Sequence, residues 1–137
     1  MGVPEIEDAK VLMIFGYNGA DSHPIVARRI LRAKQKGAKI ICVDPRVTET
    51  ARVSHIHMQL KGGSNMALVN AMAHVILEEG LCDRDFIARH TMGFEELETF
   101  LEPYTAEYGE KISHVPADTI REAARLYAKG EPSMILY

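Results

Sequence analysis

The sequence predicts an α/β fold in which a Rossmann-like, mainly parallel sheet is flanked by helices. Two short apolar runs, residues 10–15 and 39–43, have the length of strands that are buried on both faces. A helical segment lies between them, and the order strand, helix, strand is the unit from which parallel sheets are built. Farther along, the order is strand, helix, several short helices and a last strand, so a helical insertion is expected before the last strand.

The first strand is expected to end at Gly16 and the second at Asp44, which precedes a proline. The helix between them is expected over residues 24–36. Asp21 and Ser22 are the candidates for its N-cap, because short polar side chains accept hydrogen bonds from the first free amides of a helix.

Residues 48–53 are expected to form a short helical or irregular link, and residues 57–60 a brief third strand. A helix is then expected from Ser64, its candidate cap, to residue 79. Apolar side chains occur around most of its circumference, so the sequence predicts that this helix is deeply packed.

The remainder is expected to form short helices over residues 83–90 and 95–101, a turn over 105–112, and a long amphipathic helix that opens at Pro116. Residues 133–137 have the composition of a strand. Since a natural domain seldom ends inside a bare strand, we expect residues 1–137 to be one domain truncated from a longer chain.

Composition excludes several classes of partner. A net charge of −3 gives no broad attraction to nucleic acid, and no apolar run approaches the roughly 18 residues of a membrane span. The two cysteines, Cys42 and Cys82, form no disulfide framework, and Cys42 is expected to be a small core residue. A cytoplasmic, reducing location is the simpler interpretation.

Three loops are candidates for a ligand site, because ligands of open parallel sheets bind beyond the carboxyl ends of the strands. The first follows the first strand, where glycines let a ligand approach the backbone and a helix N-terminus can bind phosphate. An ordinary strand-to-helix turn is an equally good interpretation. Its candidate residues are Gly16, Tyr17, Asn18, Asp21 and Ser22.

The second candidate loop is Asp44, Pro45 and Arg46, where an acid could accept hydrogen bonds from a ribose and an arginine could reach a phosphate. From spacing alone, a solvated Asp-Pro turn is slightly favoured. The third loop comprises Gly62, Gly63, Ser64 and Asn65, and a simple turn explains it equally well. The three loops are expected to converge on one edge of the sheet.

No metal site and no catalytic group is expected within the chain. The six histidines have no ligand spacing, and no nucleophile stands near a base in the pattern.

At these loops the sequence resembles the molybdopterin oxidoreductase family, and within it the catalytic subunits of formate dehydrogenases. The likeness covers nearly the whole chain. It is carried by residues 16–27, 37–46, 48–52 and 60–68, and by the later segments 93–96, 104–105 and 115–128.

The resemblance implies a domain that holds part of a molybdopterin guanine dinucleotide. The first loop would lie against its phosphates and ribose, Asp44 and Arg46 would contact the guanosine, and the third loop would complete the site. At Gly19 the sequence departs from the family, which often has proline there.

The resemblance also implies that the family's metal ligand, its iron–sulfur cysteines and its catalytic arginine lie outside this chain. The isolated chain is therefore expected to be inactive. Its expected partners are the remaining domains and the electron-transfer subunits of the parent enzyme, which contains molybdenum or tungsten, and exposed surfaces could make the chain self-associate. Two alternatives stay open: a domain of a related reductase of nitrate or another oxoanion, and a non-catalytic nucleotide-binding module.

Overall fold

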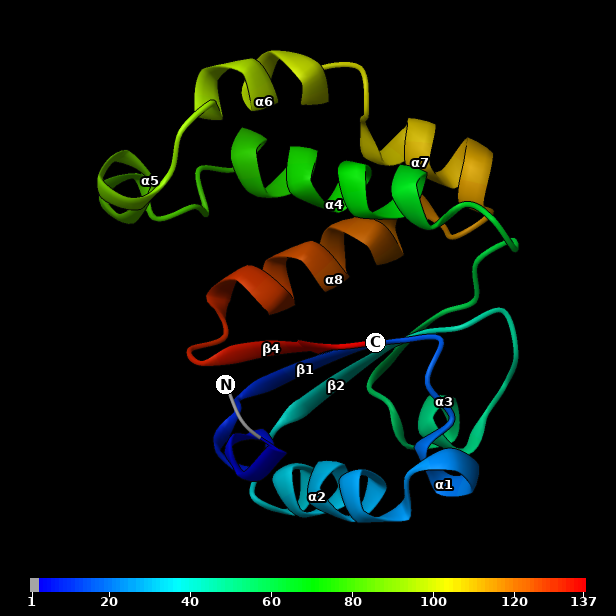
Figure 1. Ribbon diagram of the computed structural model, residues 1–137. Helices are drawn as coiled ribbons and strands as arrows, with labels where there is room; N and C mark the ends of the chain where they lie inside the picture. Colours follow the sequence, from blue (N-terminus) through cyan, green and yellow to red (C-terminus); the bar gives the residue numbers. More distant parts are fainter. Residues whose placement is uncertain (1–2) are drawn as a thin grey trace. The chain divides into compact units, whose positions relative to one another are not determined.

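The computed structural model describes residues 3–137 (Figure 1). The chain divides into two compact units, each of which is described by itself. The first unit contains the residues up to Leu60 together with Lys129–Tyr137, and the second contains Lys61–Ala128. The interpretation of the chain as one domain remains a prediction.

The first unit is built on a parallel sheet of four strands. Their order across the sheet is β3-β2-β1-β4, and every neighbouring pair is parallel. The expected α/β class and parallel sheet are confirmed. The strands are β1 (Val11–Phe15), β2 (Lys39–Val43), β3 (Ile56–Met58) and β4 (Ser133–Leu136).

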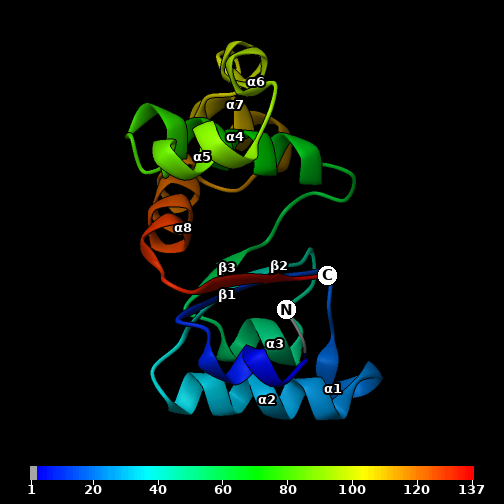
Figure 2. The same cartoon turned by 60° about the vertical axis from the view of Figure 1, so that its left-hand side comes forward.

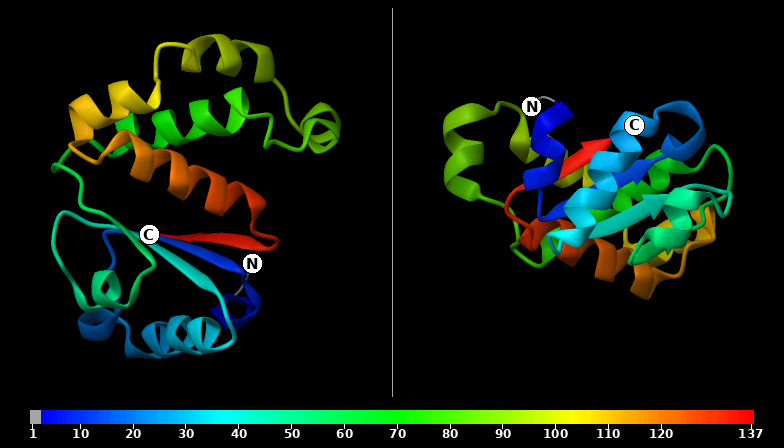
Figure 3. Two further views of the ribbon diagram at one scale, coloured as in Figure 1. Left: turned by 180° about the vertical axis from the view of Figure 1, so that it is seen from behind. Right: turned by 90° about the horizontal axis from the view of Figure 1, so that it is seen from below.

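Helices of the first unit cover one face of this sheet, as the view in Figure 2 and the view from below in Figure 3 both show. The short helix η1 (Val3–Asp8) and the helix α2 (Pro24–Gln35) contribute Ile6, Ile30 and Ala33 to a core that includes Leu12 and Ile40 of the strands. Burial of such apolar side chains is the main stabilising term for the unit.

One acidic side chain joins η1 to the basic face of α2. Glu7 Oε1 lies 3.0 Å from Arg29 Nη1 and 3.3 Å from Arg32 Nη1, and Glu7 Oε2 lies 3.6 Å from Lys36 Nζ. Burial would raise the pKa of Glu7, but the hydrogen bond from Arg32 and the charges of the three cations hold this pKa below its ordinary value.

The prediction that Asp21 or Ser22 caps α2 is wrong. Residues Gly19–Ser22 form a helix of their own, α1, which is closed by the bond from Ser22 N to Asn18 O (3.1 Å). His23 therefore stands at the N-cap of α2, and its side chain makes no capping bond. The side chain of Asp21 lies outside the described residues.

The link after β2 and the third strand differ slightly from their expected bounds. The link is the helix α3 (Glu49–Val53), which is capped by Thr48 Oγ1 accepting from Ala51 N at 3.2 Å. The third strand ends at Met58 rather than at residue 60, because Leu60 N turns back to Met58 O at 3.0 Å.

The second unit is helical. Its α4 contributes the buried residues Leu68, Ala71, Met72 and Val75. At Gly109 an added Cβ would lie 2.6 Å from Ala71 Cβ, so only glycine permits this close approach of α7 to α4. The helices are α4 (Asn65–Glu78), α5 (Arg84–His90), α6 (Phe94–Leu101), α7 (Ala106–Ser113) and α8 (Ala117–Lys129).

Two expectations for α4 are wrong. Met66 is 72% exposed and Val69 is 42% exposed, so the helix is buried along one face only. Ser64 precedes the helix without capping it, because its hydroxyl donates instead to the Lys61 carbonyl at 2.6 Å.

Residues 106–113 form a full helix, although the sequence pattern predicts a turn over 105–112. Thr105 Oγ1 accepts from Tyr108 N at 3.2 Å and provides the cap that starts α7. The helix α5 begins in the same way, since Asp83 Oδ1 accepts from Phe86 N at 2.9 Å. Over residues 3–137, none of the helices has both the length and the apolar character that crossing a membrane requires.

Candidate functional site

The loops after β1 and β2 leave the sheet at the same edge, because the two strands are parallel. Phe15 pairs with Val43 at the end of this register, and Gly16 N donates to Val43 O at 2.9 Å. The strand β1 has β2 on one side and β4 on the other, so the chain reverses its direction of winding at β1. Such a switch point is where open α/β sheets bind ligands.

In the first loop, the backbone at Gly16 has a φ of +54°, and an added Cβ would meet no atom within 4 Å. The conformation favours glycine, and the space beside it is open to a ligand. Tyr17 stacks on His23 with ring centroids 5.6 Å apart, and burial raises the pKa of its hydroxyl. The Tyr17 carbonyl accepts from Thr50 Oγ1 at 3.1 Å, which joins this loop to α3.

The departure at Gly19 has a structural counterpart. A Cβ at this position would collide with the ring of Tyr17, so this ring occupies space that a larger residue at position 19 would need. The loop is therefore compatible with glycine here as long as Tyr17 keeps its stacked position on His23.

In the second loop, Asp44 is only 1% exposed, and its Oδ1 accepts from Arg46 N at 2.8 Å. The Arg46 side chain is 71% exposed, with Nε 3.7 Å from Asp44 Oδ1. Side chains of the β3 region hold the loop from the other side: His57 Nε2 lies 2.9 Å from Asp44 O, and Gln59 Nε2 donates to Pro45 O at 3.0 Å. The loop thus presents a guanidinium and keeps its carboxylate inside.

Cys42 lies beneath this loop and is buried, as expected of a small core residue. Burial raises the pKa of its thiol to about 11, and the charge of Asp44 adds to the effect, while a hydrogen bond with Thr48 opposes it. At neutral pH this thiol stays protonated and unreactive.

The third loop belongs to the second unit. Gly63 has a φ of +86°, and Ser64 is buried, with its hydroxyl on Lys61 O. Gly62 and Asn65 are exposed. The structure therefore brings the first two loops together, and the convergence of the third with them remains a prediction.

Sequence reasoning missed the residues that fasten the two loops. His57 and Gln59 alternate along the chain and so project on the same side of an extended segment, a signal that could have identified them. Thr50 carries no such signal, because its contact with Tyr17 joins positions 33 residues apart.

A search of residues 3–137 gives no group of three or more histidine, cysteine or acidic side chains placed to hold a metal ion. The two loops present backbone amides, hydroxyls and one exposed guanidinium, a set that suits an anionic, hydrogen-bonding ligand.

The sequence matches a known family over nearly its whole length. The family model described as molybdopterin oxidoreductase matches residues 2–136. The chain is 52% identical over 135 residues to formate dehydrogenase H of Escherichia coli, covering 98% of this chain and 19% of that protein. It is 47% identical to the F420-dependent formate dehydrogenase 1 subunit alpha of Methanococcus maripaludis, covering 98% of this chain and 20% of that subunit.

More distant relatives have other activities. The chain is 41% identical to a nitrate reductase of Symbiobacterium thermophilum, covering 97% of this chain and 19% of that protein. Among solved structures, acetylene hydratase from Pelobacter acetylenicus superposes with a TM-score of 0.89 at 27% identity, covering 98% of this chain and 20% of that one.

The family match over residues 2–136 defines the class of protein: the chain belongs to the molybdopterin oxidoreductase family. Among the relatives compared, formate dehydrogenases share more of its sequence than the nitrate reductase does. The chain spans about one fifth of the length of these curated relatives.

Proposed function

We propose that this chain is the part of a formate dehydrogenase that holds one end of a molybdopterin guanine dinucleotide. The reaction of the whole enzyme would be the two-electron oxidation of formate to carbon dioxide. Identities of 42–52% to formate dehydrogenases, against 41% to a nitrate reductase, favour formate over an oxoanion as the substrate of the whole enzyme.

The observation that carries the cofactor-site proposal is the pair of loops joined at the edge of the sheet. The bond from Gly16 N to Val43 O joins the first loop to the end of β2, and the bond from Thr50 Oγ1 to Tyr17 O joins it to α3, the helix that follows the second loop. A pair of hydrogen-bonded loops at the switch point of a parallel sheet is suited to binding a nucleotide.

The residues present fit a dinucleotide. The open space beside Gly16 admits a ligand close to the backbone, and the exposed Arg46 guanidinium can pair with a phosphate or stack on a base. Asp44 is buried, and its carboxylate accepts a hydrogen bond from the Arg46 amide. A direct hydrogen bond from a ribose to Asp44 remains a prediction. Gly62, Gly63, Ser64 and Asn65 would complete the site.

The metal of the cofactor, molybdenum or tungsten, would supply the redox chemistry, and the residues of this chain would supply binding and orientation. We therefore propose that the chain alone does not oxidise formate. The remaining domains of the parent subunit, its electron-transfer subunits and its iron–sulfur cluster would complete the enzyme, for which we propose a cytoplasmic location.

Isothermal titration of the chain with GDP tests the site. We expect binding that the Arg46→Ala substitution weakens by about 10-fold or more, since a charge-assisted hydrogen bond is worth roughly 1.5–3 kcal/mol. Asp44→Ala should also weaken it, by releasing the Arg46 amide. Arg28→Ala is the matched control, because Arg28 is an exposed arginine of α2 in the same unit.

Absence of GDP binding at millimolar concentration, from a chain that circular dichroism shows to be folded, would contradict the retained guanosine site. Equal weakening by Arg46→Ala and Arg28→Ala would show that the binding is only a general attraction of GDP to positive charge.

A further inference from the structure

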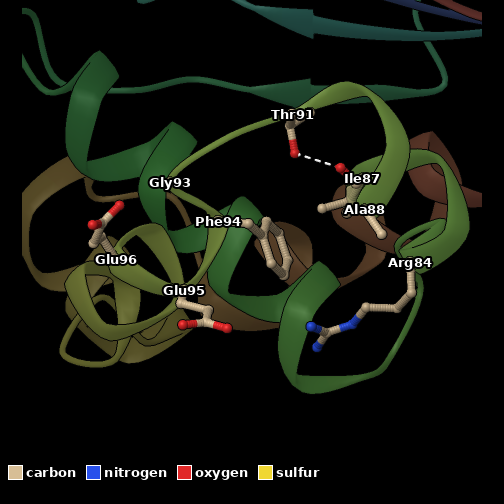
Figure 4. Close-up of a pocket in the computed structure, with 8 residues that line it drawn as sticks. All are labelled: Arg84, Ile87, Ala88, Thr91, Gly93, Phe94, Glu95 and Glu96. Carbon is tan, nitrogen blue, oxygen red and sulfur yellow. Dashed lines mark hydrogen bonds between the residues drawn. The ribbon is translucent and has the colours of Figure 1, made fainter.

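The second unit contains a groove between α5 and α6 that the proposed cofactor site does not use. Its volume is about 530 Å³. Figure 4 shows the Phe94 ring in the middle of this groove, with Arg84 on one side and Glu95 on the other. The lining residues from α5 and the following turn are Arg84, Ile87, Ala88 and Thr91, and those from α6 and its N-cap are Gly93, Phe94, Glu95 and Glu96.

The positive charge in the groove is neutralised within the unit. Arg84 Nη2 donates to Glu98 Oε1 at 2.7 Å, and its guanidinium carbon lies 5.0 Å from the centroid of the Phe94 ring. These two contacts fix the guanidinium over the aromatic ring.

The negative charge in the groove comes from the first turn of α6, where Glu95 and Glu96 complement the helix N-terminus. Glu95 and Glu96 are largely exposed, and within the described chain neither makes a salt bridge. Their two carboxylates therefore give the rim an acidic character around an apolar floor of Ile87, Ala88 and Phe94.

Exposed apolar side chains also occur on α5, on α6 and in the turn between them. Met92, in the turn between the two helices, is 99% exposed, Phe86 of α5 is 54% exposed, and Leu97 and Phe100 of α6 are 46% and 53% exposed. Several large apolar side chains gathered on two short helices with polar residues between them are typical of an interaction surface.

We propose that the groove between α5 and α6 is a docking surface for a basic, apolar helical segment of a partner protein. An apolar side chain of the partner would enter the groove beside Ile87 and Ala88, and lysine or arginine side chains next to it would pair with Glu95 and Glu96. Charge complementarity identifies this occupant, because an acidic segment would be repelled by the same two carboxylates.

The proposal can be tested with the full 137-residue chain and a fluorescent amphipathic helical peptide made of leucine and lysine. Anisotropy at an ionic strength of about 0.15 M gives the affinity. The control peptide has glutamate in place of every lysine. We expect the lysine peptide to bind and the glutamate peptide not to bind.

Two pairs of matched variants locate the binding. Glu95→Gln with Glu96→Gln should weaken the lysine peptide roughly 3- to 10-fold, as expected for two exposed ion pairs. Glu122→Gln with Glu131→Gln changes two exposed glutamates elsewhere and should leave the affinity unchanged. Met92→Ser should weaken binding, whereas Met66→Ser, at a position 72% exposed on α4, should not.

Equal effects of the groove variants and their controls would overturn the proposal, as would equal binding of the two peptides. Sedimentation of the chain without peptide tests whether a second copy of this chain occupies the surface instead. If the chain dimerises and Met92→Ser dissociates the dimer, the surface binds a second copy of this chain, and the proposal of a basic partner is wrong.

Discussion

In the short loop after β2, the buried Asp44 carboxylate stabilises the backbone and the exposed Arg46 guanidinium is available to a ligand. Asp44 bonds to the amide of Arg46, and this bond fixes the backbone from which the Arg46 side chain extends into solvent. A short polar side chain that bonds to the backbone two residues ahead is a common way to stabilise a turn. The proposed ligand contact of Arg46 therefore depends on a residue that solvent scarcely reaches.

The burial of Cys42 predicts that its thiol reacts slowly with alkylating reagents. With a pKa raised to about 11 by burial and by Asp44, roughly one thiol in a thousand is ionised at pH 8. Iodoacetamide at that pH should therefore alkylate the partly exposed Cys82 and leave Cys42 unmodified in the folded chain, as measured by peptide mass spectrometry.

In urea both cysteines should be alkylated at similar rates, which serves as the control for reagent access. Alkylation of Cys42 as fast as Cys82 in the folded chain would contradict the burial of the residue beneath the second loop.

The positions of the site residues could be predicted from the sequence, but their burial could not. The positions of Gly16, Asp44 and Arg46 at the strand ends follow from the apolar runs that precede them. The burial of Asp44 does not, because it depends on the fastening of its loop by His57 and Gln59 from a different strand region.

At the scale of elements, α3 connects the two candidate loops of the first unit. Thr48 caps the helix just after the second loop, and Thr50 in its first turn donates to the Tyr17 carbonyl of the first loop. The helix is short, so its position depends on these side-chain contacts more than on its own helical propensity. Movement of α3 would therefore affect both loops.

Replacing Thr50 with valine tests this connection. Valine keeps the shape of the side chain but leaves the Tyr17 carbonyl without its donor, at an expected cost of about 1–3 kcal/mol in the free energy of unfolding. Urea unfolding gives this free energy. Thr50→Ser keeps the hydroxyl and should stay closer to the original stability; a valine variant as stable as the original chain would contradict the role of this bond.

Helices were harder to anticipate than strands for a physical reason. Continuous apolar runs marked β1 and β2 to within a residue. The sequence pattern did not indicate α7, because its start depends on the cap at Thr105 and it packs closely on α4 at Gly109. In the same way, the apolar composition of α4 indicated burial all round, while Met66 and Val69 are exposed.

For the molecule as a whole, the family match supports the class of protein, and the geometry of the first unit supports the position of the proposed cofactor site. The family match covers nearly the whole chain, and it establishes the class of protein. The geometry of the first unit adds a pair of loops fixed at the switch point of the sheet, with one exposed arginine. The cofactor-site proposal depends on both, because the family indicates the ligand and the loops indicate where it would bind.

Placing this chain in a complete enzyme tests whether it holds part of a guanine dinucleotide. In formate dehydrogenase H of Escherichia coli, the segment that is 52% identical would be replaced by this chain, and the purified chimera assayed for guanine nucleotide released on denaturation and for formate-dependent dye reduction. We predict that the chimera contains the nucleotide and oxidises formate, and that Arg46→Ala lowers both while Arg28→Ala lowers neither. A folded chimera that contains no guanine nucleotide, or one in which the two arginine variants behave alike, would contradict the account.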